Sequence, residues 1–238
     1  MNIAGHDIGD AIDGLYEEID ARLRAEADRE LMVDSAEMNA ISNIAWDEGA
    51  STVNVVVHEG VPTHALPHVV AVALQHVRQR LERYPAVRPP ESDDPSEGPM
   101  LRQALRELVL SAEAEMQIAS LDLDQQWEQE QRHAGLKDLL REPPAGWEES
   151  GSEGNKFMAL QYARFASQHP EQMWEGLKGS FVEKLPSAAE HGETVLELVR
   201  LTGWGTLGGC LESLVRARDE LGMSDVALIE DRRSGDLG

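Results

Sequence analysis

Residues 51–84, STVNVVVHEGVPTHALPHVVAVALQHVRQRLERY, contain the clearest strand pattern and the clearest helix pattern in the chain. Val53 to Val57 form a β-branched run bounded by glycines, which predicts a buried strand. Pro67 suits the first turn of a helix, because its missing amide needs no partner there. The pattern therefore predicts a helix from about Ala65 to Tyr84 that Pro85 ends.

Apolar residues recur at steps of three and four on both sides of this stretch, which predicts further amphipathic helices. The expected helices cover residues 8–30, 35–46, 100–140 with a break near Asp122, 155–167, 170–185, 188–201 and 207–221. The last nine residues, EDRRSGDLG, are expected to fray. The sequence thus predicts an α+β fold that is mostly α-helical, with a small β element followed by a helical bundle.

Two segments rich in proline and acidic residues divide the chain. Residues 85–99, PAVRPPESDDPSEGP, hold five prolines and little apolar surface, which predicts a mobile acidic loop. Residues 143–153, PPAGWEESGSE, form a second expected loop. We therefore expect an α+β core over residues 1–142 and a C-terminal helical region over residues 154–230.

The charge balance limits the classes of partner. The chain has 21 basic and 44 acidic residues, for a net charge of −23. This charge disfavours direct binding to nucleic acid or to an anionic membrane, because both need a basic face. The plainest interpretation is a solvated acidic surface, and a partner protein of positive charge is the functional alternative.

Location and thiol chemistry follow from two further features. No apolar run approaches the length of a membrane span, and the N-terminus is acidic where a signal peptide is basic and then apolar. A cytoplasmic location is therefore expected. The single cysteine, Cys210, excludes an internal disulfide and lies in an apolar helical pattern, which favours a buried structural thiol over a nucleophile.

Four of the eight histidines, His58, His64, His68 and His76, lie within residues 51–84. Residues 67–81, PHVVAVALQHVRQRL, resemble the active-site helix of the gluzincin-type (zincin-like) zinc metallopeptidases. In an H-E-x-x-H helix the two histidines bind zinc and the glutamate activates a water molecule. The resemblance places Val72 at the first histidine, Ala73 at the glutamate and His76 at the second histidine.

The resemblance covers about residues 50–120 and also implies a third zinc ligand on a later helix. Gluzincins use a glutamate there, and LVLSAEAEM, residues 108–116, offers Glu113 and Glu115. We expect only one of these two side chains to be buried. With the first histidine and the glutamate replaced, the resemblance implies a pseudoenzyme with no catalytic residue and no cofactor. Such a protein would act by binding another protein.

Two alternatives remain open. The first is an active zinc-dependent hydrolase with an unconventional site drawn from His58, His64, His68, His76, Glu113 and Glu115. His68 and His76 are eight helical residues apart, or roughly 12 Å, so one ion cannot join them. His64 and His68 with His58 or Glu59 form the other possible set, although hydrogen-bonded structural histidines explain the pattern as well. The second alternative is a helical scaffold or adaptor protein. The oligomeric state is open.

Overall fold

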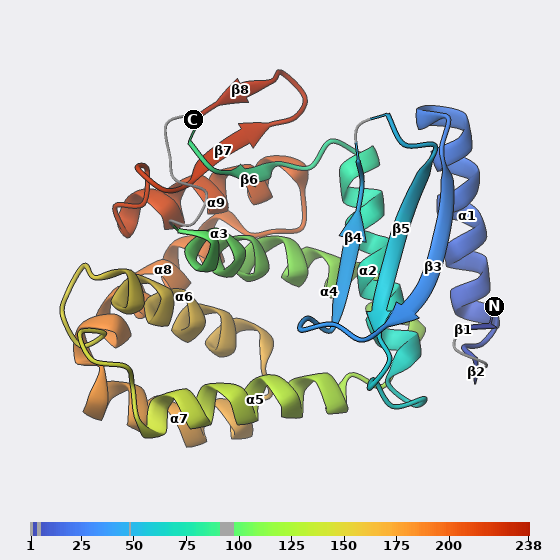
Figure 1. The fold of residues 1–238 in the computed structure, drawn as a ribbon. Helices are drawn as coiled ribbons and strands as arrows, with labels where there is room; N and C mark the ends of the chain where they lie inside the picture. The colour runs from blue at the N-terminus through green and yellow to red at the C-terminus, as the bar shows by residue number, and fades with distance from the viewer. Residues whose placement is uncertain (1, 4–5, 48, 91–97) are drawn as a thin grey trace. The chain divides into compact units, whose positions relative to one another are not determined.

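The computed structural model describes residues 2–3, 6–47, 49–90 and 98–238 (Figure 1). The protein has an α+β fold in which helices predominate, as the sequence predicted. The chain forms two compact units. Unit 1 comprises Met1–Glu82 and Ala114–Glu130, and unit 2 comprises Arg83–Glu113 and Gln131–Gly238. The division therefore runs through the segment expected to be one core, residues 1–142.

Unit 1 is built on a three-stranded sheet in the order β3-β5-β4 (Figure 1). The strands are β3 (Glu30–Ala36), β4 (Ser42–Ala45) and β5 (Thr52–His58), with β5 parallel to β3 and antiparallel to β4. The predicted strand is confirmed as β5. Its residues alternate between fully and partly buried, so only one of its faces lies in the core.

The helix expected over residues 35–46 is wrong, because β3 and β4 occupy that region. Asp34 and Ser35 suggested a helix cap, yet both lie in β3. Central strand β5 needs hydrogen-bonding partners on both edges, and β3 and β4 supply them. Pairing over this longer range outweighs the local capping preference.

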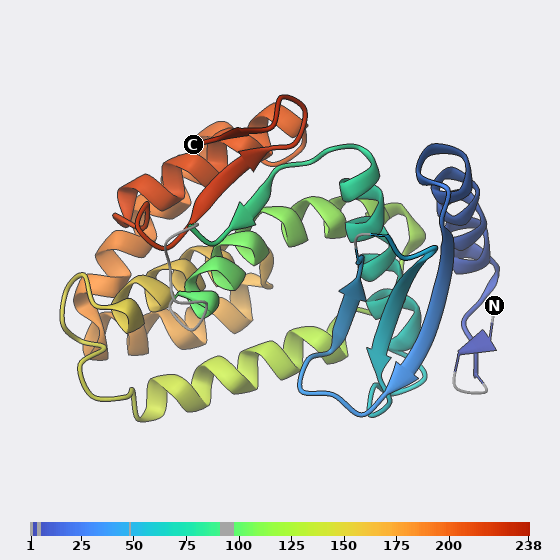
Figure 2. The ribbon, with the colours of Figure 1, turned by 45° about the horizontal axis from the view of Figure 1, so that its top comes forward.

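Helices α1 (Asp10–Ala27) and α2 (Leu66–Leu81) pack against the sheet in unit 1 (Figure 2). Their buried residues form one apolar core with Val53, Val55 and Val57 of β5. Residues of α4 (Ala112–Ile118) and of the 3-10 turn η2 (Ala119–Leu121) join this core. The short strands β1 (Asn2–Ile3) and β2 (His6–Asp7) pair with each other.

Helix α2 confirms the prediction for this part of the chain, with Pro67 in its first turn. It ends at Leu81, somewhat before Tyr84. Arg83 adopts a left-handed backbone conformation, with φ of 59°, so the helix cannot continue through it. The helix therefore ends because of the backbone conformation of Arg83, two residues before Pro85.

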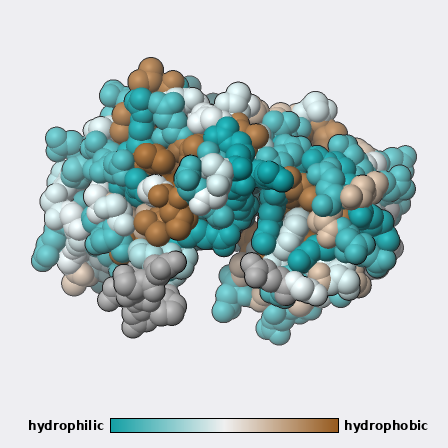
Figure 3. All heavy atoms as spheres, turned by 90° about the horizontal axis from the view of Figure 1, so that it is seen from above, coloured by the Kyte–Doolittle hydropathy of each residue, from teal (hydrophilic) through white to brown (hydrophobic). Residues whose placement is uncertain are grey.

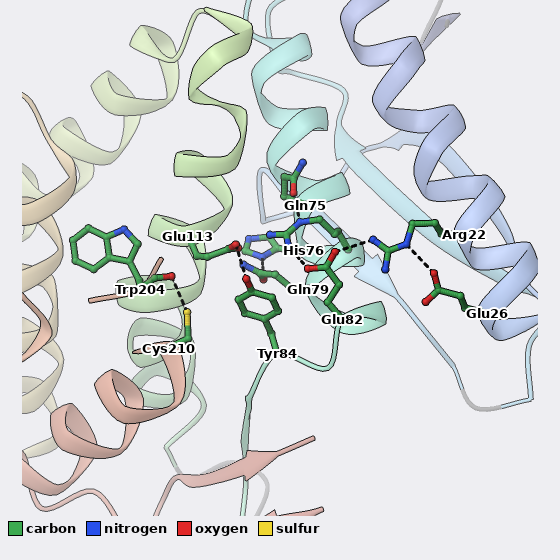
Figure 4. A network of polar contacts seen from close by, with 11 residues as sticks. Arg22, Glu26, Gln75, His76, Gln79, Glu82, Tyr84, Glu113, Trp204 and Cys210 are labelled. Carbon is green, nitrogen blue, oxygen red and sulfur yellow. Dashed lines mark hydrogen bonds and ion pairs between the residues drawn. The ribbon is translucent and has the colours of Figure 1, made fainter. Parts of the chain in front are cut away.

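Unit 2 is mainly helical. Its helices are α3 (Pro99–Arg106), the π-helical η1 (Glu107–Ser111), most of α5 (Gln126–Arg141), α6 (Glu153–Gln168), α7 (Glu171–Lys184), α8 (Pro186–Thr202) and α9 (Leu207–Glu220). The four helices expected in the C-terminal third are confirmed. In unit 1, Asp122 has a φ of 49° and marks the break that was expected within residues 100–140. Cys210 is buried as expected, and its Sγ donates to the Trp204 carbonyl at 3.1 Å (Figure 4).

The C-terminal residues do not fray, which corrects the prediction. Strand β7 (Leu228–Asp231) pairs with β6 (Ala86–Arg88) on one side and with β8 (Asp236–Leu237) on the other. Ile229 is buried in the core of unit 2, and this burial offsets the cost of ordering the chain end. Part of the expected mobile loop, Ala86–Arg88, forms strand β6 instead. Residues 91–97 of that loop lie outside the described residues.

The π-helical turn η1 is held by a side chain of α6. The Gln168 side-chain amide donates to the carbonyl of Leu108 at 2.9 Å and to that of Glu107 at 3.4 Å. Backbone carbonyls displaced from regular helical pairing need such partners when they are partly buried. Gln168 therefore stabilises the irregular turn.

Replacing Gln168 with leucine should lower the free energy of unfolding by about 2 kcal/mol, because the Leu108 carbonyl then loses its donor. Urea unfolding at neutral pH measures this difference. Gln172→Leu on the exposed side of α7 is the control and should change stability by less than about 0.5 kcal/mol. Equal effects of the two variants would contradict the role of Gln168.

No helix in the described residues is long and apolar enough to span a membrane. Hydrophilic side chains dominate the face in Figure 3, with small apolar areas between them. This appearance agrees with the excess of acidic over basic residues in the chain.

Candidate functional site

The helix positions expected to mark a lost metal site lie on α2. Ala73, at the position of the family's glutamate, has an exposed fraction of 0% and belongs to the apolar core of unit 1. Val72 is partly buried and packs against the same core. Small apolar side chains therefore occupy the two positions at which the resembled family has a zinc ligand and a general base.

The polar residues of α2 are hydrogen-bonded within unit 1. His76 Nδ1 lies 2.8 Å from Oε1 of Gln79 (Figure 4), and His68 Nδ1 lies 3.1 Å from Oε2 of Glu128. Gln79 and His68 are both buried. The carboxylate of Glu128 orients the His68 ring, and the Gln79 amide orients the His76 ring.

A chain of ion pairs connects the C-terminal end of α2 with α1 (Figure 4). Arg78 donates to Gln75 and to Glu82, and Glu82 also accepts from Arg22 at 2.8 Å. Arg22 in turn donates to Glu26 at 2.8 Å. Hydrogen bonds to Glu26 and Glu82 raise the pKa of the Arg22 guanidinium above its ordinary value. This network joins the two helices and leaves the guanidinium groups charged.

The histidines of the turn before α2 do not share one centre. His58 Nδ1 accepts the Gly60 amide at 2.7 Å, His64 is exposed, and His68 is bonded to Glu128. Within the described ranges, no three histidine, cysteine, aspartate or glutamate side chains converge as a metal site would require. His58 and His68 therefore act as separate hydrogen-bonding groups and not as ligands of one metal ion.

Glu113 and Glu115 fall in different units, because the division of the chain passes between them. Glu113 is fully buried and accepts a hydrogen bond from the Tyr84 hydroxyl at 3.0 Å, within unit 2 (Figure 4). Glu115 is partly buried. The expectation that only one of the two would be fully buried is confirmed, and the buried one is Glu113.

An exposed edge strand is the second notable feature of unit 1, and the sequence reasoning missed it. In the described part of the chain no other strand pairs with the outer edge of β3. At one end of this edge, side chains of α1 form hydrogen bonds with the backbone of Leu31. The Leu31 amide donates to Asp20 Oδ1 at 2.8 Å, and the Leu31 carbonyl accepts from the Tyr16 hydroxyl at 2.8 Å. Helix α1 thus blocks the edge at Leu31.

Beyond Leu31 no described strand is hydrogen-bonded to this edge, although the short strand β1 contacts β3. Backbone groups along a strand alternate between its two sides, so those of Val33 and Ser35 point the same way as those of Leu31. Asp34 Oδ1 accepts the Ser35 amide at 2.8 Å. Met32, whose exposed fraction is 53%, stands between Glu30 and Asp34, which are also exposed. The apolar run Leu31-Met32-Val33 was the local signal that could have suggested this strand.

The Asp20 carboxylate is expected to stabilise the edge. Burial raises its pKa, but hydrogen bonds from the Leu31 amide and from Arg24 outweigh this effect, so the pKa lies below the ordinary value of 3.8. The stabilisation is therefore complete above the unfolded-state pKa and is lost as the pH falls through the lower folded-state pKa. Asp20→Ala should cost about 2 kcal/mol at pH 7, and clearly less at the acid end of the range, in urea unfolding.

Glu17→Ala, at an exposed position of the same helix, is the control for Asp20→Ala. It should change the free energy of unfolding by less than about 0.5 kcal/mol at any pH. A loss for Asp20→Ala that stays constant down to acid pH would contradict a stabilising role for the ionised carboxylate.

Comparisons with family models, with curated proteins and with solved structures give no match to this chain.

Proposed function

We propose that this chain is a non-catalytic, metallopeptidase-like protein that binds an extended, positively charged segment of another protein along strand β3. The observation that carries the proposal is the edge of β3 beyond Leu31, where a row of exposed side chains borders backbone groups that face away from the sheet. Extended peptides commonly bind by adding a strand to such an edge.

The non-catalytic part of the proposal is supported by α2. A metallopeptidase needs a general base near the metal, and the position that resembles its place holds Ala73, inside the apolar core. Val72 likewise offers no ligand atom. His76, the remaining residue of the motif, is bonded to Gln79. The positions of these three residues support the proposal that α2 now serves to pack the core of unit 1.

The chemistry of the partner follows from the side chains beside the edge. Glu30 and Asp34 project on the solvent side of β3 with Met32 between them. A bound strand that alternates basic, apolar and basic residues would match this row. The net charge of −23 would also attract a basic segment over longer distances and raise its association rate. Backbone hydrogen bonds would supply affinity, and the side-chain row would supply specificity.

Selection from a displayed library of ten-residue peptides tests the proposal. Enriched peptides should carry alternating lysine or arginine, and their affinity should fall at least tenfold on Val33→Pro, which removes the outward backbone donor. Val33→Ala is the matched control, because it keeps the amide while shortening the side chain. In the wild-type protein, bound peptide should shift the backbone amide resonances of Val33 and Ser35.

Three results would contradict the proposal. Enriched peptides without positive charge, or peptides that bind Val33→Pro as tightly as Val33→Ala, would contradict binding along β3. Amide shifts that avoid Val33 and Ser35 in the wild-type protein would do the same, even if Val33→Pro failed to fold.

A further inference from the structure

A cavity of about 310 Å³ lies in unit 2 among α3, η1, α5 and α6, whose courses can be followed in Figure 2. Its volume falls within the range of small-molecule sites in proteins. The apolar part of its wall consists of Met100, Ala104, Leu136, Leu139, Phe157 and Phe165. We propose that this cavity binds a small amphiphilic carboxylate, with the hydrocarbon chain against the apolar wall and the carboxylate against arginine.

The charged part of the wall supports an anionic head group. Glu107, Arg132 and Arg164 line the cavity, so guanidinium groups form part of its wall in a chain whose net charge is −23. Arg164 is ion-paired with Glu107, and its side chain is 10% exposed. Guanidinium groups bind carboxylates through two parallel hydrogen bonds, and partial burial strengthens that interaction.

The wall of the cavity contains an irregular element with its own support. Glu107 is the first residue of the π-helical turn, whose carbonyls are held by Gln168. Arg164 Nε is 3.4 Å from Oε1 of the same Gln168. Glu107 and Arg164 are therefore positioned by a common partner before any ligand arrives. Pre-positioned polar groups reduce the ordering cost of binding, and π-helical turns often occur at functional sites.

Gly135 provides a way to fill the cavity without touching its charges. This glycine of α5 lines the cavity, and a Cβ atom built on it meets no heavy atom within 4 Å. A leucine at this position would add its side chain to open space, whereas an alanine would add one methyl group. The pair of variants separates occupancy of the cavity from the general effect of replacing a helical glycine.

Calorimetric titration with octanoate, octan-1-ol and octylamine tests the proposal on the full-length protein. Octanoate should bind one site at least tenfold more tightly than octan-1-ol, and octylamine should bind most weakly. Decanoate should bind about fifteenfold more tightly than octanoate, since each buried methylene contributes about fourfold. Equal affinity for octanoate and octan-1-ol, or the absence of saturable octanoate binding, would overturn the proposal.

The variants locate the site. Gly135→Leu should weaken octanoate binding at least tenfold, and Gly135→Ala should leave it within about twofold. Arg132→Gln should reduce the preference for octanoate over octan-1-ol while leaving octan-1-ol binding unchanged. Octanoate binding that is unaffected by Gly135→Leu would place the ligand elsewhere and refute the assignment. Peptide binding along β3 of unit 1 is measured separately, so the two proposals fail independently.

Discussion

Ala73→Glu is expected to lower the free energy of unfolding by about 3 to 5 kcal/mol. The side chain of Ala73 is fully buried among apolar residues of unit 1, so a glutamate there would be a buried charge without a built partner. The variant must take up a proton or displace packed side chains, and both reactions cost stability. Thermal and urea unfolding at pH 7 measure the loss.

Two controls separate charge from position. Ala21→Glu adds the same carboxylate on the exposed side of α1 and should change stability by less than about 0.5 kcal/mol. Ala73→Gln tests size without charge and should be less harmful than Ala73→Glu. If Ala73→Glu were as stable as the wild type, then the position would accept the glutamate of a metallopeptidase. That result would contradict the packing role assigned to this part of α2.

Gly192→Leu should cost about 3 kcal/mol, because α6 and α8 approach closely at this glycine. A Cβ atom at position 192 would lie 2.6 Å from Cβ of Tyr162, and the ring of Tyr162 cannot easily move away. This ring packs edge-on against Trp174 and Phe181, with centroid separations of 4.7 and 5.3 Å. Its hydroxyl also donates to Glu193 at 2.7 Å. Differential scanning calorimetry should show a clear fall in melting temperature.

Gly176→Leu in α7 is the matched control. A Cβ atom at this exposed helical glycine meets nothing within 4 Å, so leucine should raise stability by about 0.5 to 1 kcal/mol through its better helix propensity. Opposite signs for the same substitution at two helical glycines would show that the close approach decides the outcome. A loss of equal size at both positions would point instead to a general intolerance of leucine.

The helices were the most predictable part of the fold. Apolar residues at steps of three and four in α1, α2 and α6 to α9 report the buried face of each helix directly, so their positions follow from local sequence. Strands β3 and β4 were not predicted. Their stability depends on pairing with β5, and a capping signal at Asp34 and Ser35 was the stronger local feature.

The C-terminal hairpin escaped prediction for a similar reason. Residues 230–238 are polar, and β7 is ordered by strand β6, more than a hundred residues earlier in the chain. The ion pair between Arg88 and Glu230, at 2.8 Å, joins the same two strands. No pattern within the last nine residues could have indicated this pairing.

The candidate site was predictable only in part. The sequence identified Val72, Ala73 and His76 as residues of one helix, and that helix is confirmed as α2. Local spacing could not specify the partners of the histidines, because Glu128 lies 60 residues from His68. The open edge of β3 and the cavity of unit 2 depend on tertiary packing, so neither has a local sequence signal.

Zinc analysis of the protein purified without chelator tests the central claim most directly, together with the same measurement on His76→Ala. A protein whose α2 serves packing and whose β3 serves binding should contain far less than one zinc ion per chain, and His76→Ala should not change that content. About one zinc ion per chain, lost on His76→Ala, would mean that His76 belongs to a working metal site. The proposed non-catalytic role would then be wrong.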